Sequence, residues 1–296
     1  MQKIATDLLA LIKDRVDNLS KDQIEEIFVS SNEIVPLEKP KSKKKAAQTK
    51  VRYCFGVYAI KKKIAKRSKD VKKYYMQVYI NKNILGHCQY ILREYGILYD
   101  RGYYLIAEWP EFGTLFEFLR DERNNHIVNW NWKLTQAYNL AQALAFCHAK
   151  SILHQDIRSL NVIVNQFEEA KLTNFHYQSE LMDNACVFGE GNETIRWQSP
   201  EKVLNKTLAF SRATDVYSFG VLLWEITAHK IPYEGIDAAA VKRRVTSGLR
   251  PEIVEQTPPG YAKIMKSCWD QNPNMRPQMG NVWGELQQLW DSGSVR

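Results

Sequence analysis

The segment of residues 152–176 gathers polar side chains of the kinds that carry out chemistry. It contains Asp156, then Asn161 five residues later, and then Asn174. Asn161 opens the short β-branched run 162–164, which favours a strand. A carboxylate can accept a proton, and an amide oxygen can contact a hard cation, although it brings that cation no negative charge. Other elements of the chain must hold this segment in place.

Length and composition are those of a globular protein. The 296 residues are enough for one two-lobed domain and a short extension. The five cysteines are odd in number and far apart, and no pair has the spacing of metal ligands, which is typical of a reducing compartment. Acidic residues interrupt the apolar N-terminus, so no signal peptide is expected, and no run of about eighteen apolar residues predicts a transmembrane segment. We therefore expect a cytoplasmic protein.

Positive charge is concentrated in the stretch Lys39–Lys73. It holds fifteen Lys or Arg residues and a single acid, Asp70, in a chain whose formal net charge is +8. One interpretation is a solvated loop followed by a surface helix. The alternative is a binding site for nucleic acid or for anionic lipid, and the lipid case would place the protein at the membrane periphery.

The first third of the chain predicts helices, a linker and a β-rich region. Apolar residues at helical spacing predict amphipathic helices within 1–35, and residues 36–50 are expected to form a basic loop. The aromatic and β-branched stretch Val51–Lys63 predicts a strand or hairpin arm. The next expected elements are a helix through Val71–Leu85 and strands near Ile91–Leu98 and Tyr103–Glu108.

Helical patterns dominate the rest. Apolar residues from Trp132 onward predict a long buried helix that ends before Ser151, directly ahead of the polar segment. Three motifs follow farther along the chain: Ser199-Pro-Glu201, the run from Asp215 to Glu225, and Cys268-Trp-Asp followed by Arg276-Pro.

In order and separation, these motifs resemble those of protein kinases over roughly residues 51–290. Val57-Tyr-Ala-Ile-Lys61 resembles a kinase third strand, and Glu108-Trp-Pro-Glu-Phe-Gly-Thr-Leu resembles the hinge. The chain is similar to the tyrosine-kinase-like group and, within it, to the mixed-lineage kinase domain-like pseudokinases. Kinase-like chains of fungal expansions look comparably close.

The resemblance implies an α+β, two-lobed protein-kinase fold. A small β-rich N-lobe with one helix would span about 51–108, the hinge about 108–113, and a larger helical C-lobe about 114–290. The helices of 1–35 would precede the domain as a brace-like or regulatory segment, joined to it by the basic linker 36–50.

The resemblance also implies the roles of individual residues. Asp156 corresponds to the catalytic base, and Asn161 and Asn174 correspond to the positions that hold metal. The implied nucleotide-binding positions are Lys61, Glu108, Trp109 and Asn174. The implied structural contacts are the pair of Glu201 with Arg276, backbone N–H groups of the catalytic loop on Asp215, and a stack of His154 on Phe175.

Positions that handle phosphate depart from the kinase pattern. Asn174 replaces the metal-holding aspartate, and no glycine occurs between residues 32 and 55, where kinases have a glycine-rich loop. The glutamate of the N-lobe helix should fall near Gln77 or Val78, yet no acid lies between residues 71 and 93. The phosphate-gripping lysine would therefore have no carboxylate from this helix to position it.

Three further departures concern the loops. His176 replaces a glycine, and Gln155 stands where many kinases have an arginine that binds a phosphate on the activation segment. Pro110 falls at the hinge position whose N–H usually donates to adenine, and proline has no N–H. We therefore expect ATP to bind weakly or not at all, and the Mg²⁺ site to be weak or lost.

These departures favour a pseudokinase, a catalytically inactive or very weak regulatory or scaffold protein in intracellular signalling. One alternative is a divergent active Ser/Thr or Tyr kinase with Asp156 as its base. Another is a binding module that engages nucleic acid or anionic lipid through Lys39–Lys73. The expected partners are other signalling proteins, including an upstream kinase that acts on Tyr177, Ser179 or Thr194.

Overall fold

The computed structural model describes residues 27–36, 48–53, 57–65, 72–175 and 193–293. The chain divides into two compact units, Met1–Glu111 and Phe112–Arg296. The helices expected before residue 27, residues 37–47 of the expected linker, and the expected phosphorylation targets Tyr177 and Ser179 lie outside the described residues.

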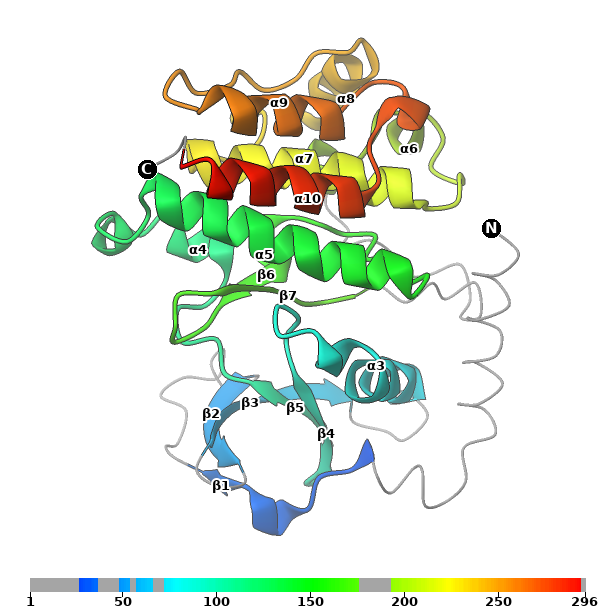
Figure 1. Cartoon of the computed structure of the whole chain (residues 1–296). Coiled ribbons are helices and arrows are strands. Elements are labelled where there is room, and N and C mark those ends of the chain that lie inside the picture. The colour runs from blue at the N-terminus through cyan, green and yellow to red at the C-terminus, as the bar shows by residue number, and fades with distance from the viewer. Residues whose placement is uncertain (1–26, 37–47, 54–56, 66–71, 176–192, 294–296) are drawn as a thin grey trace. The chain divides into compact units, whose positions relative to one another are not determined.

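A five-stranded antiparallel sheet forms the core of the first unit (Figure 1). Its strands lie in the order β1-β2-β3-β5-β4. The bounds are β1 Val35–Pro36, β2 Gln48–Tyr53, β3 Val57–Ala65, β4 Glu94–Tyr99 and β5 Tyr103–Glu108, with the helix α3 over Lys72–Asn83. The stretch expected as a strand or hairpin arm is the β2–β3 hairpin. Because β2 begins at Gln48, which pairs with Lys62, the last three residues of the expected loop are strand instead.

Apolar side chains cover both faces of this sheet. On one face, Val78 of α3 packs with Ile97 of β4 and Leu105 of β5. On the other face, Ala59 and Ile106 lie in a second cluster. Successive residues of a strand point to opposite faces, so Leu105 and Ile106 mark which face is which.

The segment before β1 packs along β4. The backbone N–H of Val29 donates to the carbonyl of Ile97 at 2.9 Å, and Ile27 is buried in the cluster that contains Val78. A Cβ atom at Gly96 would lie 2.5 Å from the carbonyl oxygen of Ile27. Glycine at this position therefore permits the close approach of the two chains.

The second unit is mainly helical. Figure 1 shows α5, α7 and α10 as neighbours, with α9 packed on α7. The helices are α4 Leu115–Phe118, α5 Trp130–Ala149, α6 Pro200–Leu204, α7 Arg212–Ala228, α8 Ala238–Thr246, α9 Pro259–Cys268 and α10 Met279–Asp291. A two-stranded antiparallel sheet joins β6 Val162–Val164 to β7 Ala170–Leu172. The long helix expected from Trp132 is confirmed as α5, which starts at an Asn129 cap that accepts the N–H of Trp132.

The α7 helix lies at the centre of this unit. Its side chains from Thr214 to Thr227 are buried, with the exception of Ser218, which is half-buried. A Cβ atom at Gly220 would stand 2.9 Å from the Cβ of Cys268, so this glycine allows α7 and α9 to pack closely. A buried central helix of this kind can hold polar groups of the loops around it in fixed positions.

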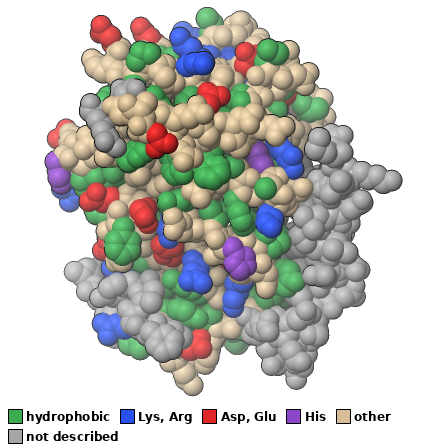
Figure 2. Space-filling view, in the orientation of Figure 1, with side chains coloured by type: hydrophobic (Ala, Val, Ile, Leu, Met, Phe, Trp, Pro, Cys, Tyr) green, Lys and Arg blue, Asp and Glu red, His purple; other side chains and the backbone are tan. Residues whose placement is uncertain are grey.

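The described surface mixes residue types. Figure 2 shows acidic, basic and hydrophobic side chains interspersed on the face in view. Among the described residues, no helix has both the length and the apolar character needed to cross a bilayer.

Candidate functional site

The loop that precedes Asp156 is held by a carboxylate of α7. Asp215 is 1% exposed, and its two oxygens accept the backbone N–H groups of His154 at 2.9 Å and Gln155 at 2.8 Å. The Nε2 atom of His148 lies 3.0 Å from the same carboxylate. The role predicted for Asp215 is therefore confirmed. Gln155 has a positive φ of 72°, a strained conformation that these contacts stabilise.

The Asp156 carboxylate is engaged by its own loop. One oxygen accepts a hydrogen bond from the Asn161 side-chain nitrogen at 2.6 Å, and the other lies 3.1 Å from Nε of Arg158. The same Asn161 nitrogen also donates to the Asp156 backbone carbonyl at 2.8 Å. The side chain of Asp156 is 11% exposed. These contacts brace the loop and engage both oxygens of the carboxylate at the predicted base position.

Asn161 and Asn174 bind each other. The side-chain nitrogen of Asn174 donates to Oδ1 of Asn161 at 3.0 Å, while the backbone N–H of Thr173 donates to the Asn161 carbonyl. Asn174 adopts φ 58°, the left-handed region, which asparagine tolerates better than most residues. Asp156, Asn161 and Asn174 thus form one chain of hydrogen bonds at the ends of β6 and β7.

The two predicted Mg²⁺ ligands are both amides. The Oδ1 atom of Asn161, the oxygen that would contact a metal, is already an acceptor for Asn174. Mg²⁺ is usually held by one or two carboxylates together with phosphate, and the second ligand position here is an uncharged amide. Across the described ranges, no group of three His, Cys, Asp or Glu side chains could hold a metal ion.

The aromatic stack predicted next to this site is confirmed. The rings of His154 and Phe175 are 4.6 Å apart between centroids, and both residues are buried. His154 Nε2 lies 3.0 Å from the carbonyl of Thr173, which fixes the ring between the loop and the end of β7.

Two residues of the site were missed by sequence reasoning. Arg158 stands two positions after Asp156, and that spacing was the only available signal for their ion pair. Glu225, the last residue of the α7 motif, accepts hydrogen bonds from the backbone and hydroxyl of Ser159 and from the indole of Trp197 at 2.6–3.1 Å. Burial raises the pKa of Glu225 to about 6, against the lowering effect of these donors. This carboxylate anchors the loop at Ser159, and Asp215 anchors it at His154 and Gln155.

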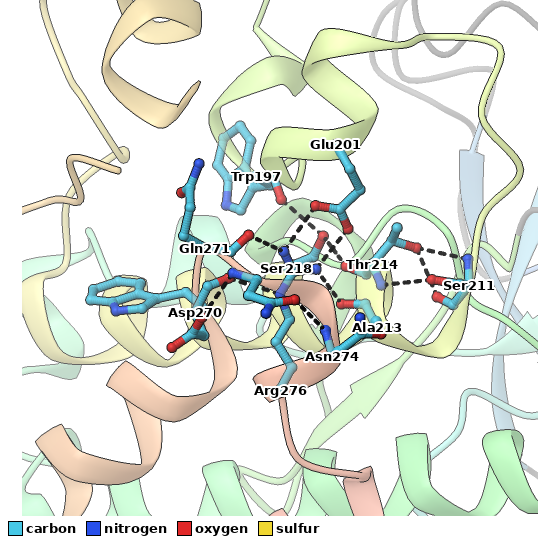
Figure 3. Close-up of polar contacts among 12 residues, drawn as sticks. Trp197, Glu201, Ser211, Ala213, Thr214, Ser218, Asp270, Gln271, Asn274 and Arg276 are labelled. Atoms are coloured by element: carbon cyan, nitrogen blue, oxygen red, sulfur yellow. Dashed lines mark hydrogen bonds and ion pairs between the residues drawn. The ribbon is translucent and has the colours of Figure 1, made fainter. Parts of the chain in front are cut away.

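The predicted ion pair of Glu201 and Arg276 is confirmed (Figure 3). The two terminal nitrogens of Arg276 donate to the two carboxylate oxygens at 2.7 and 2.9 Å. Arg276 also donates to the carbonyls of Ala213 and Asp270, both at 2.9 Å. Burial acts to raise the pKa of Glu201, but the hydrogen bonds from Arg276 outweigh it and the pKa is lowered.

The predicted hinge positions lie in the first unit. Glu108 ends β5, where its backbone N–H donates to the carbonyl of Arg93 at 2.9 Å. The Lys50 ammonium lies 5.0 Å from the ring centre of Trp109 and 2.9 Å from the carboxylate of Glu111. Pro110 follows Trp109 and supplies no N–H for a ligand.

The predicted phosphate lysine lies in β3. Lys61 pairs with Thr49 of β2 and Ile106 of β5, and its side chain is outside the described part of the structure. The neighbouring helix α3 contains no acid. Its Gln77 instead donates a hydrogen bond to Glu94, a buried residue of β4 that sequence reasoning did not consider.

The structure therefore brings part of the predicted site together. Asp156, Asn161 and Asn174 form one cluster in the second unit. Lys61, Glu108 and Trp109 belong to the first unit.

The sheet with one helix, followed by a helical unit with this loop, defines a protein-kinase fold. The model of the family "Protein tyrosine and serine/threonine kinase" matches residues 43–286, which is more than half of the chain. The chain belongs to this family.

Known relatives agree with this assignment. The chain is 28% identical over 191 residues to the RGS domain-containing serine/threonine-protein kinase A of Dictyostelium discoideum, a match that covers 64% of this chain and 16% of the relative. It is 28% identical over 187 residues to the serine/threonine/tyrosine-protein kinase HT1 of Arabidopsis thaliana, covering 62% and 47% of the two chains. It is 28% identical over 211 residues to the mitogen-activated protein kinase kinase kinase zak-1 of Caenorhabditis elegans, covering 67% and 28%. The chain thus spans less than half of the length of each of these relatives.

Proposed function

We propose that this chain is a pseudokinase that regulates or scaffolds other signalling proteins. The observation that carries the proposal is the hydrogen-bond chain from Asp156 through Asn161 to Asn174. In it, the Asp156 carboxylate accepts from the Asn161 side-chain nitrogen, and the Asn161 side-chain oxygen accepts from the Asn174 side-chain nitrogen. Asn174 itself is an amide where phosphoryl transfer needs a charged metal ligand.

The size of the expected defect supports the same proposal. Removing one electrostatic element of a catalytic site commonly costs about 10²–10³ in rate. Here the metal carboxylate, the acid of α3 and the glycine-rich loop are all replaced in the sequence. These parts act together, so their costs need not multiply, yet little of an ordinary kinase rate would remain.

Thermal unfolding of the full chain with ATP, with and without Mg²⁺, tests the proposal. A ligand that binds only the folded state raises the melting temperature by an amount that grows with the ratio of its concentration to its Kd. We expect a small shift or none, and the same shift in the presence and absence of Mg²⁺. A large shift that requires Mg²⁺ would contradict the proposal. The variant Lys61→Ala reports whether any shift depends on the strand lysine.

A divergent active kinase is the second candidate. It is favoured by Asp156 and Asn161 themselves and by the names of the relatives, all of which are kinases. Phosphate transfer from ATP to a general protein substrate, with Asp156→Asn as the matched control, separates the two candidates. Transfer that disappears in Asp156→Asn would establish an active enzyme, whereas equal background in both chains supports the pseudokinase.

Regulation by an upstream kinase is part of the proposal. Thr194, one of the expected targets, begins a 3₁₀ turn over Thr194–Arg196, and its carbonyl accepts the N–H of Trp197 at 3.2 Å. A phosphate group on Thr194 could pair with the positive charge of the nearby Arg196. Mass spectrometry of the protein from cells shows whether Thr194 is modified, and Thr194→Ala tests whether the modification changes the partners.

A further inference from the structure

Three basic side chains from separate parts of the second unit gather at the C-terminal end of α7. Arg120 lies two residues after α4, Lys133 lies near the start of α5, and His229 is the residue at which α7 ends. The Lys133 ammonium donates to the carbonyl of Thr227 at 3.3 Å, which places it at the last turn of α7. The charges of Lys133 and Arg120 both lower the pKa of His229, so the three groups lie near one another.

Each of the two cations lies against an aromatic ring. The guanidinium carbon of Arg120 is 3.9 Å from the ring centre of Phe116, and Nζ of Lys133 is 5.0 Å from the ring centre of Trp130. The negative face of an aromatic ring attracts a cation. These contacts hold the charged groups in place, but they do not neutralise them.

Many hydrogen-bond donors of the three side chains are unused. Nη1 of Arg120 donates to the carbonyl of Phe116 at 3.0 Å, whereas its Nη2 atom is buried and has no hydrogen-bond partner. Nε2 of His229 is also buried without a partner. A buried polar atom without a partner costs free energy, so its presence in a folded protein needs an explanation.

No acidic side chain neutralises the cluster. Within the part of the chain that the structure describes, none of the three basic groups forms an ion pair. Burial lowers the pKa of Arg120, although the charges of Glu225 and Glu234 act to raise it, and both oxygens of Glu225 already accept other hydrogen bonds. Burial and the two cations lower the pKa of His229 to about 4, so its ring is neutral at pH 7.

Helix capping explains only one of the three side chains. Cations are favoured at the C-terminus of a helix, and Lys133 binds a carbonyl there. The guanidinium of Arg120 donates to Phe116, outside α7, and His229 caps the helix through its backbone N–H, which donates to the carbonyl of Glu225 at 2.9 Å. The unpaired side-chain nitrogens of Arg120 and His229 have no such role.

We propose that Arg120, Lys133 and His229 bind a phosphate group, supplied as free phosphate or by a phosphorylated molecule. A phosphate group carries nearly two negative charges at pH 7 and has three strong acceptor oxygens, which suits two cations and a ring that gains a proton on binding. Guanidinium groups are well matched to phosphate. The three side chains are half-buried, so rotation about their terminal bonds brings the covered nitrogens to the surface.

The pKa of His229 in the full chain provides the first test. The chain is labelled with ¹³C-histidine, and the signal that is missing from His229→Asn is assigned to His229. Asparagine tolerates the φ of 54° at this position. At constant ionic strength in chloride the pKa should be about 4, and saturating inorganic phosphate should raise it by about one unit, because a bound anion favours the protonated ring. An unchanged pKa overturns the proposal.

The second test compares two lysines of α5. Calorimetry at constant ionic strength measures the Kd of the full chain for inorganic phosphate. Lys133→Gln should raise this Kd about tenfold, because it removes a charge-assisted hydrogen bond. Lys150→Gln is the matched control and should leave the Kd unchanged, since Lys150 is exposed and its ammonium also faces a ring, that of Phe146 at 5.9 Å. Equal effects of the two changes overturn the site.

Competition identifies the source of the phosphate group. Displacement of inorganic phosphate by a lower concentration of O-phosphoserine supports a phosphorylated side chain as the ligand, and displacement only by a higher concentration supports free phosphate. Acetate that competes as well as either overturns the assignment to phosphate. The His229 titration is made on the wild-type chain, so it decides the proposal even if a variant does not fold. ATP is not a probe here, so these outcomes are separate from the thermal-shift test of the proposed function.

Discussion

Arg276 holds Glu201 with both terminal nitrogens, at 2.7 and 2.9 Å, from 75 residues farther along the chain. The arginine side chain is fully buried, and the glutamate side chain is 20% exposed. The pair joins α6 to the segment between α9 and α10, and it does so next to the carbonyl of Ala213 at the start of α7.

Replacing Arg276 by Ala should lower the free energy of unfolding by about 3–5 kcal/mol, because the change removes the partner of a largely buried carboxylate. Urea unfolding measures this loss. The matched control is Arg123→Ala, which removes an exposed ion pair with Asp121 and should leave the unfolding midpoint unchanged. A small effect of Arg276→Ala would contradict a structural role for the pair.

Glu225 should make stability depend on pH in the opposite direction from ordinary ion pairs. Its pKa in the folded protein is about 6, above the usual value of 4.5, because the group is buried. Its contribution to stability is therefore fully present below pH 4.5 and is lost as the pH rises through about 6. The difference between the two pKa values corresponds to about 2 kcal/mol in the free energy of unfolding. Urea unfolding from pH 4 to 8 should show this loss in the wild type, whereas Glu225→Gln should lack it.

Replacing Asn174 by Asp should create a metal-dependent stability. The new carboxylate would stand beside Asn161 and near Asp156, so like charge should destabilise the variant without metal. Addition of Mg²⁺ should raise its melting temperature but leave that of the wild type unchanged. Equal responses of the two chains to Mg²⁺ would contradict the conclusion that the amide is what weakens the site.

Two helical glycines should respond to alanine with opposite signs. Gly220→Ala places a Cβ 2.9 Å from the Cβ of Cys268, and overpacking of this kind costs about 1–3 kcal/mol. A Cβ at Gly284 in α10 meets no atom within 4 Å, so Gly284→Ala should stabilise the chain by about 0.5–1 kcal/mol through helix propensity. Denaturant unfolding of the two variants tests both signs together.

The sequence was sufficient to predict the larger elements and the contacts between motifs. The periodicity of α5, the Glu201–Arg276 pair and the role of Asp215 could all be predicted, because the residue types are specific and their order in the chain is informative. The hairpin β2–β3 was harder, since Val51–Lys63 reads as one aromatic and β-branched stretch in which Gly56 is the single residue typical of turns.

The polar contacts of Glu94 could not be predicted. Glu94 follows the apolar residues Ile91 and Leu92, and nothing in that pattern indicates whether its carboxylate points to solvent or to α3. The pairing register and the hydrogen bond from Gln77 show that it points to α3.

The contacts of Asp215 affect how the catalytic-type loop moves. The amides of His154 and Gln155 are bound to a side chain of the most buried helix in the second unit, so hydrogen exchange at these amides requires that helix and loop come apart. Their protection should therefore resemble that of the core rather than that of a surface loop. The loop would keep its catalytic geometry because global stability maintains it, whether or not the chain transfers phosphate.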